Sequence, residues 1–493
     1  MSRRLLRQAI GLASLAVAAA TLPGCKRASQ GPVQVIAIGD GLKVRDPAIG
    51  PLSVPQSILV QNVAQGLVRF DASGNIVGGL AERWNVSDDG LSYIFRIASA
   101  EWPDGTKITA QQVARELKRE LASRSRNELS DSLGAVEEVV AMTDRVIEIR
   151  LRAPRPNLLS LLAQPQMGIF RNGFGSGPFA IDRERSQAGA LRLVRSFAAD
   201  DDEARQSDEL LLSAASARDA VAAFAKGSAD LVLGGTFIDL PYVRSVKLPR
   251  NVLRFDPASG LFGLAPLRTE GPFGSADARR LLSQSLDRDA IVAALAVPNL
   301  APRTTLLEPG LDGIAPPAPP AWTATPLAER LPRLQATSRT LFGKKQPLSV
   351  RVYLPEGPGA DLLLQQLQRS WAQIGLTVER SDRESRADFM LVDLVAPSSS
   401  PAWFVRRLRC GAVRVCDDKM DELTDAARQT QIPAERYAML AQAAAIADDK
   451  QLFLPITAPI RWSLVSARIA SFAGNRFARH SLMNLQQAQR DGD

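Results

Sequence analysis

The chain reads GLAERWNVSDDGLSYIFRIASAEWPDGTKITAQQV from Gly79 to Val113, and this run predicts two paired strands followed by a helix. Asp89 and Gly90 are predicted to form the turn between the strands, because such a pair tolerates the positive φ of a tight hairpin. Apolar residues then alternate with polar ones, so the second strand has one apolar face; they are Leu91, Tyr93, Phe95 and Ile97. We therefore expect a β-hairpin here.

The same run ends with the signals of a helix start. Thr109 is the predicted N-cap, and Gln112, three residues later, completes a capping box. Ile108 and Val113 occupy the two positions of a hydrophobic staple, which fixes how the chain enters the helix. The pattern predicts a helix over residues 110–121.

This run resembles a signature of the family 5 solute-binding proteins, which serve ABC importers of oligopeptides, dipeptides and nickel. The matching residues are Gly79, Leu80, Ala81, Glu82, Trp84, Ser87, Asp88, Asp89, Gly90, Phe95, Asp104, Gly105, Ala110 and Val113. Further similar runs are GSGPF at 175–179, ARDAVAAFAKGSADLVL at 217–233, PFGSADARRLLSQSLDR at 272–288 and WAQIGLTV at 371–378. The resemblance covers residues 33–485.

The resemblance implies an α/β protein with the two-lobed, class C-like periplasmic-binding-protein fold, in which mixed sheets are joined by crossovers. Residues 33–50, 168–258 and 460–493 would form the core of lobe I, residues 51–167 its extra subdomain, and residues 259–459 lobe II. A small solute would bind between the lobes, and lobe closure would favour the form that an ABC permease recognises. The protein would act as a monomer and without a cofactor.

The N-terminus carries export signals. Arg3, Arg4 and Arg7 precede an apolar segment at residues 10–22 that is too short for a stable membrane span. Residues 1–24 are therefore predicted to be a signal peptide that directs the protein to the periplasm.

Leu22-Pro23-Gly24-Cys25 resembles a bacterial lipobox. Cys25 would then be lipidated and become the mature N-terminus, and residues 25–32 would tether the protein to the membrane. The alternative is an ordinary cleaved signal peptide followed by a chance cysteine.

Cys410 and Cys416 are the other two cysteines. Outside the cytoplasm such a pair is expected to form a disulfide that closes a small loop, and two buried thiols are the alternative. A metal site would need more ligands, and the only histidine, His480, is distant in sequence.

The charged residues indicate a solvated surface and no nucleic-acid partner. The 60 basic residues are scattered among 52 acidic ones, with a formal net charge of +8. The chain has no basic block, zinc-finger pattern or RNA-recognition signature, which nucleic-acid-binding proteins commonly show.

Ligand specificity is expected in the run ADFMLVDLVAPSSSPAWF at 387–404. In peptide-binding relatives, the corresponding run contains Trp and Tyr, and its acid pairs with the α-amino group of the peptide. Here the Trp and Tyr are missing, and Asp393 is the only acid in the core of the run. Asp393 would either bind an amine-bearing ligand or be a hydrogen-bonded structural acid.

Three further residues are candidate ligand contacts. Trp403 and Arg406 follow the same run, and a basic residue near this position can hold a peptide carboxylate in relatives. Asp40 follows the strand predicted at 33–38, in a loop that borders the cleft in the family. The alternatives are a solvated arginine cluster for Arg406 and a polar turn residue for Asp40.

Two other classes of function are weighed against solute import. An enzyme is disfavoured because the chain lacks zinc motifs, a phosphate loop and a histidine beside a nucleophile. Ser176 does not fit a nucleophile elbow, since Phe174 stands where that motif requires glycine. A family member without an import partner, acting as an envelope sensor or structural protein, is the alternative, because features typical of relatives are missing.

Overall fold

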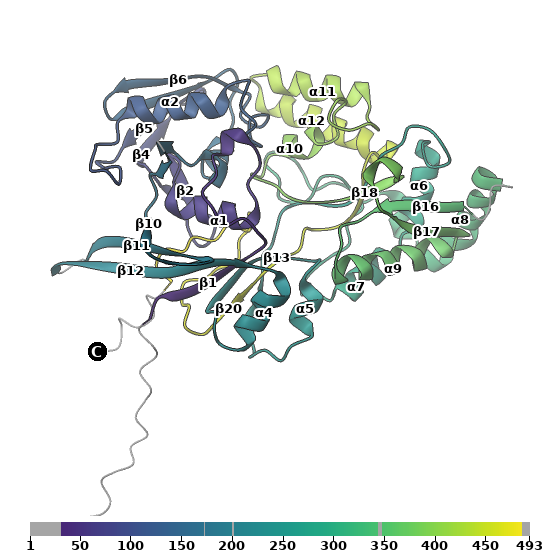
Figure 1. Cartoon of the computed structure of the whole chain (residues 1–493). Coiled ribbons are helices and arrows are strands. Elements are labelled where there is room, and N and C mark those ends of the chain that lie inside the picture. The colour runs from purple at the N-terminus through teal and green to yellow at the C-terminus, as the bar shows by residue number, and fades with distance from the viewer. Residues whose placement is uncertain (1–30, 172, 200–201, 344–347, 486–493) are drawn as a thin grey trace, which may run out of the picture. The chain divides into compact units, whose positions relative to one another are not determined.

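The computed structural model of the chain describes residues 31–171, 173–199, 202–343 and 348–485 (Figure 1). The predicted signal peptide and the lipidation site Cys25 lie outside these residues. The chain divides into two units, Met1–Pro32 and Val33–Asp493, and the description below concerns the second.

The first main sheet has seven strands in the order β10-β11-β12-β1-β13-β20-β14 (Figure 1). Strand β1 runs parallel to both of its neighbours, whereas the other pairs are antiparallel. Both faces of β1 are buried, with Ile36 and Ile38 in one apolar cluster and Val33 and Val35 in another. The strands are β1 Val33–Ile38, β10 Ala180–Gln187, β11 Ala190–Ala199, β12 Asp202–Ala215, β13 Leu231–Thr236, β14 Leu253–Phe255 and β20 Arg461–Val465.

The second main sheet has five strands in the order β17-β16-β18-β15-β19. Alternate residues of β15 enter different apolar clusters, because successive side chains of a strand point to opposite faces: Phe262 joins the cluster with α6 to α9, and Leu261 joins the cluster with α10 to α12. The strands are β15 Gly260–Pro266, β16 Leu348–Tyr353, β17 Leu376–Ser381, β18 Phe389–Val395 and β19 Leu454–Thr457. The helices are α6 Ala276–Ser285, α7 Arg288–Leu295, α8 Leu327–Phe342, α9 Pro358–Ala372, α10 Pro401–Arg406, α11 Asp418–Gln429 and α12 Pro433–Lys450.

Two short connections join these sheets. The chain passes from β14 to β15 through residues 256–259 and returns from β19 to β20 through residues 458–460. The five-stranded sheet is therefore built from one continuous segment, whereas the seven-stranded sheet takes its strands from both sides of that segment.

The hairpin and helix predicted for residues 79–121 are confirmed. Gly90 has φ +67 in the turn between β4 and β5. The Gln112 N–H donates to Thr109 Oγ1 at 3.4 Å, and the Thr109 N–H donates to Gln112 Oε1 at 3.2 Å, which completes the capping box of α2. Ile108 and Val113 are buried in the same cluster as the apolar face of β5.

These elements belong to a four-stranded sheet in the order β4-β5-β7-β6. Its parts are β4 Ala81–Val86, β5 Ser92–Ile97, β6 Val136–Thr143, β7 Val146–Leu151 and α2 Ala110–Leu121. The remaining elements are α1 Val54–Val63, α3 Leu158–Leu162, α4 Ala217–Ala225, α5 Leu240–Arg244, β2 Val68–Phe70, β3 Ile76–Gly78, β8 Phe170–Arg171, β9 Phe174–Gly175 and the 3-10 turns η1 Pro47–Ile49, η2 Pro165–Met167, η3 Ala321–Ala324 and η5 Glu384–Arg386.

The GSGPF run packs against the end of α1. The Gly177 N–H donates to the Val63 carbonyl at 2.9 Å, and Ser176 Oγ donates to the Ile169 carbonyl at 2.9 Å. A Cβ on Gly177 would lie 2.6 Å from the Asn62 carbonyl oxygen. Glycine is required here because two backbone segments meet.

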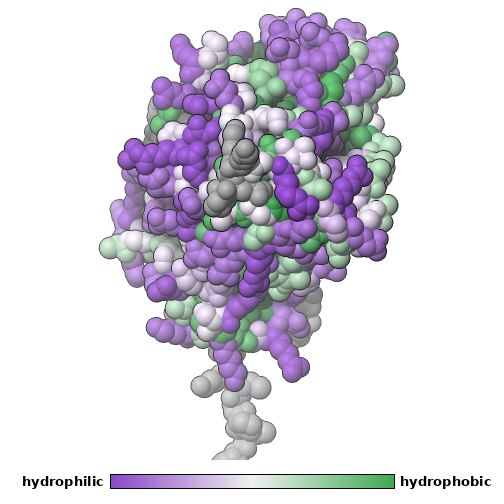
Figure 2. Space-filling view, turned by 90° about the vertical axis from the view of Figure 1, so that its right-hand side faces the viewer, coloured by the Kyte–Doolittle hydropathy of each residue, from purple (hydrophilic) through white to green (hydrophobic). Residues whose placement is uncertain are grey.

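The exposed surface mixes polar and apolar residues. Figure 2 views the side on which α8, β16 and β17 lie in Figure 1, and hydrophilic residues predominate there, with hydrophobic ones in scattered groups. Within the described ranges, no helix combines the length and apolar character needed to cross a membrane.

Asp448 is a partly buried acid in α12, and its carboxylate accepts a hydrogen bond from the Leu306 N–H at 2.7 Å. Burial raises its pKa from 3.8 to about 7. The folded protein therefore holds a proton that the unfolded chain releases near pH 4. The stabilisation that Asp448 contributes through this proton is fully present below pH ~4 and is lost as the pH rises through 7.

We expect Asp448→Asn to flatten this pH dependence, because the amide keeps an oxygen for Leu306 and does not ionise. Between pH 5 and pH 8 the variant should lose about 2–3 kcal/mol less stability than the wild type. Urea unfolding at both pH values measures this. Asp449→Asn is the control, since its side chain is 69% exposed, and equal pH slopes for wild type and Asp448→Asn would contradict the prediction.

Candidate solute-binding cleft

Two cavities, of about 290 and 490 Å³, adjoin each other and share lining residues. The smaller is lined by the end of β13, the end of β18, the start of β20 and the first turns of α1. The larger lies between β18, α10 to α12 and residues 155–157. They share Glu128, Leu394, Trp403 and Arg407, and we call the two together the cleft.

Asp393 lines the smaller cavity and is paired within the protein. Arg461 Nη1 donates to its two carboxylate oxygens at 2.8 and 3.0 Å, and Arg461 Nη2 donates to its backbone carbonyl at 3.3 Å. The pair connects β18 of one main sheet to β20 of the other. Burial raises the pKa of Asp393, and the positive charge of Arg461 opposes that rise.

Trp403 lines both cavities and is 6% exposed. The Arg407 guanidinium lies 5.1 Å from the centre of its ring, within cation–π range. Burial lowers the pKa of Arg407. Across the part of the chain that the structure describes, neither Trp403 Nε1 nor the Arg407 guanidinium has a hydrogen-bond acceptor.

Arg406 lines the larger cavity, but it is held by Asp131. Its Nε donates to Asp131 Oδ2 at 2.9 Å, its Nη2 donates to Asp131 Oδ1, and Arg409 Nη1 donates to the same Oδ1 at 3.1 Å. Only 13% of the Arg406 side chain is exposed. Its neighbour Arg407 is therefore better placed to meet a solute.

Asp40 lies apart from the other predicted residues. It is exposed in the loop after β1, its carbonyl accepts a hydrogen bond from Ser53 Oγ at 3.3 Å, and it lines neither cavity of the cleft. A polar turn residue, the alternative considered from the sequence, describes this position better.

Three arginines that sequence reasoning did not single out also line the larger cavity: Arg155, Arg428 and Arg436. Arg155 Nη2 donates to the Arg428 carbonyl at 2.9 Å, and Arg436 Nη1 donates to the Pro154 carbonyl at 2.7 Å. Burial, followed by repulsion from the other arginines, lowers the pKa of Arg155 to about 10. These residues come from segments more than 270 residues apart, so no local pattern indicates that they meet.

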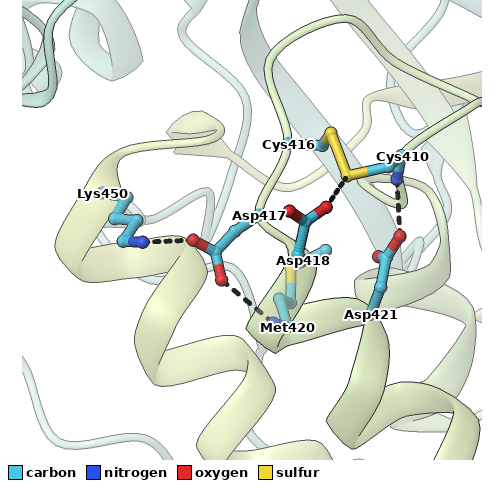
Figure 3. Close-up of a disulfide and its surroundings, with 7 residues drawn as sticks. All are labelled: Cys410, Cys416, Asp417, Asp418, Met420, Asp421 and Lys450. Carbon is cyan, nitrogen blue, oxygen red and sulfur yellow. Dashed lines mark hydrogen bonds and ion pairs between the residues drawn. A yellow bond between two sulfur atoms is a disulfide. The ribbon is translucent and has the colours of Figure 1, made fainter.

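Cys410 and Cys416 form a disulfide just after α10 (Figure 3). The Cys410 N–H donates to Asp421 at 2.9 Å, while Asp417 caps α11 through the Met420 N–H at 3.0 Å and pairs with Lys450. The disulfide therefore fixes the loop between α10, which carries Trp403 and Arg406, and α11. Within the described ranges, no group of three or more potential metal ligands occurs.

We expect the Cys410→Ser/Cys416→Ser variant to be less stable than the wild type by about 2 kcal/mol, because the unfolded chain loses a small closed loop. Urea unfolding with and without a reducing agent measures the effect. The reducing agent should destabilise the wild type and leave the double variant unchanged. A wild type that keeps its stability once mass spectrometry shows both thiols free would contradict this prediction.

The sequence profile of the bacterial extracellular solute-binding proteins, family 5 (middle), matches residues 75–401. The glutathione-binding protein GsiB of Escherichia coli K12 is 27% identical over 188 residues, which are 35% of this chain and 36% of that relative.

Solved structures show the same fold. The E. coli murein tripeptide binding protein MppA superposes with a TM-score of 0.77 at 17% identity, covering 92% of this chain and 97% of that one. AgaA of A. tumefaciens R10, in complex with agropinic acid, superposes with a TM-score of 0.70 at 17% identity. The match covers 91% of this chain and 96% of that one.

The predicted two-lobed α/β fold is confirmed by these structural neighbours, and the predicted residue boundaries of the lobes stay a prediction. The family profile covers well over half of the chain, with the hairpin, the capped helix and most strands of both main sheets in the matched region. The chain therefore belongs to the bacterial extracellular solute-binding proteins of family 5.

Proposed function

We propose that this protein captures a small polar solute, of peptide-like or comparable size, in the cleft and delivers it to an ABC permease. The supporting observation is the pair of adjoining cavities, the smaller of which is lined by strand ends of both main sheets. Their volumes, about 290 and 490 Å³, are typical of small-molecule sites. Relatives that bind glutathione, murein tripeptide or agropinic acid support a solute of this size.

The proposal places the protein in the periplasm, as a monomer held at the membrane through a lipid on Cys25. Binding rather than catalysis is proposed, since the relatives are solute-binding proteins.

A family member without an import partner is the second candidate. The observation that favours it is the Asp393–Arg461 pair, because the acid expected to hold a peptide ammonium is already occupied. Such a protein would act as an envelope sensor or structural component.

The deciding experiment is mass spectrometry of protein purified from its native membrane. We expect a diacylglyceryl group on Cys25 and a co-purified small molecule that dissociates on unfolding. Thermal unfolding of the stripped protein with peptides, sugars and amines then identifies the class of solute. Absence of stabilisation by any class would favour the second candidate, and a turnover lost in Ser176→Ala would refute solute binding as the sole activity.

A further inference from the structure

The larger cavity carries an excess of positive charge. Six arginines and four acidic residues line it; the arginines are Arg155, Arg406, Arg407, Arg409, Arg428 and Arg436. Among residues that the structure describes, Asp131 is the one acid of this lining that forms a salt bridge with these arginines, and it pairs with Arg406 and Arg409. The other four arginines have no carboxylate partner there.

The hydrogen bonds of three of these arginines orient them without neutralising them. Arg155, Arg428 and Arg436 donate to backbone carbonyls, the last two at 3.1 Å to Gly134 and at 2.7 Å to Pro154. A carbonyl dipole satisfies an N–H donor but leaves the formal charge in place. The side of the larger cavity that these arginines line therefore keeps its positive charge where water is partly excluded. A solute with negative charge would be favoured there.

Arg407 is the arginine best placed to bind such a group. It lines both cavities, is exposed to them, and stacks on Trp403, which restrains the guanidinium without using its N–H donors. Glu128 and Asp131 attract it, yet neither is within salt-bridge distance of it. Trp403 Nε1 is a second donor at this position that has no acceptor among the described residues.

In the smaller cavity, two acidic residues that could bind a cationic group of a solute are already paired within the protein. Asp393 is neutralised by Arg461, and Asp256 accepts from the Asn475 N–H at 2.9 Å and contacts His480. Neither carboxylate is free to pair with an ammonium group. Glu128, which lines both cavities, is the third acid here; it accepts from Gln166 Nε2 at 3.1 Å and forms no salt bridge among the described residues. The Asp393 position is therefore closed to an amino group, whereas Glu128 is not.

We propose that the solute is an anion whose carboxylate or phosphate binds Arg407 at the junction of the two cavities, and that Asp393 does not pair with an amino group of the solute. This deepens the proposed function and rests on it. A guanidinium offers two parallel N–H donors to such a group, which gives a bidentate, charge-assisted contact.

The test uses the mature protein, stripped of ligand, and calorimetric titration with matched probes. Trialanine amide carries only an ammonium, N-acetyl-trialanine only a carboxylate, and succinate, galacturonate and inorganic phosphate extend the anions beyond peptides. We expect the probes that bind to be anions, with affinities that fall as salt is added. Binding by carboxylates but not phosphate, or the reverse, identifies which acid group is recognised.

Arg407→Gln should weaken binding of each anion that binds the wild type at least tenfold, and Arg407→Lys should retain intermediate affinity because it keeps the charge but not the planar fork. Arg414→Gln is the matched control, since Arg414 is exposed and lines neither cavity. The affinity of Arg414→Gln for each anion should stay within twofold of the wild-type affinity. Thermal unfolding without ligand checks that all three variants fold.

The outcomes separate the two proposals. Binding of trialanine amide with no binding of any anion would overturn the anion proposal and leave solute binding intact. Anion binding that is unchanged in Arg407→Gln would also overturn it. No binding by any probe, together with no co-purified molecule, would overturn the proposed function itself.

Discussion

Replacing Arg461 by methionine is expected to lower the free energy of unfolding by about 3–5 kcal/mol at pH 8. The substitution leaves the Asp393 carboxylate without its cation in a position where 14% of the side chain is exposed. Removing one partner of a buried ion pair strands the other charge, which costs more than the pair itself contributes. Urea unfolding measures the loss.

The cost should depend on pH with a defined sign. Burial already raises the pKa of Asp393, and Arg461 opposes that rise. Without Arg461 the pKa of the folded state rises further, so Asp393 folds in its protonated form at low pH, and the destabilisation grows with increasing pH. A loss that is equal at pH 5 and pH 8 would contradict this account.

Two variants control for this prediction. Asp393→Leu/Arg461→Met removes both charges and should recover most of the stability, because apolar replacements of buried ion pairs are often neutral. Arg150→Met removes an exposed arginine from β7, whose side chain is 46% accessible, and should cost far less stability than Arg461→Met, because exposed ion pairs contribute little.

Replacing Gly177 by alanine is expected to cost about 3 kcal/mol or more. The added Cβ would lie 2.5 Å from the Ala64 nitrogen and 2.6 Å from the Asn62 carbonyl oxygen. These are backbone atoms at the end of α1, so no side-chain rotation relieves the clash and the helix or the GSGPF run must move.

The variant should also weaken solute binding, because Val54, Ser57 and Ile58 of α1 line the smaller cavity. Gly173→Ala is the control: Gly173 has φ +79 and nothing within 4 Å of its Cβ, so only backbone strain of about 1–2 kcal/mol is expected. Urea unfolding and calorimetry measure both effects. Equal losses of unfolding free energy in Gly177→Ala and Gly173→Ala would show that the clash with α1 does not cause the destabilisation.

Local elements were predictable because their signals lie within a few residues. Thr109 and Gln112 cap each other directly, and Asp89-Gly90 supplies its own turn. Strand β1 follows from the run VQVIAI, in which five of six residues are apolar and which ends at a glycine. None of these elements needs information from another part of the chain.

The cleft was predictable only in part, because its contacts join distant segments. The sequence indicated Asp393 as either a ligand contact or a structural acid, and only the fold shows that Arg461, 68 residues later, reaches it. Arg406 was selected for its charge, but Asp131, 275 residues earlier, pairs with it. Charge and residue type indicated which side chains could act, while the partner of each depended on tertiary packing.

Because the chain leaves the seven-stranded sheet and returns to it through two short connections, the last strand of that sheet comes late in the sequence. Strand β20 pairs with both β13 and β14, yet it lies about 200 residues after them. Until residues 461–465 are available for folding, β13 has an unpaired edge, and such an edge can pair with other chains. A partly folded chain that still lacks β20 is therefore open to aggregation, which favours its binding by a chaperone until its C-terminal part is available.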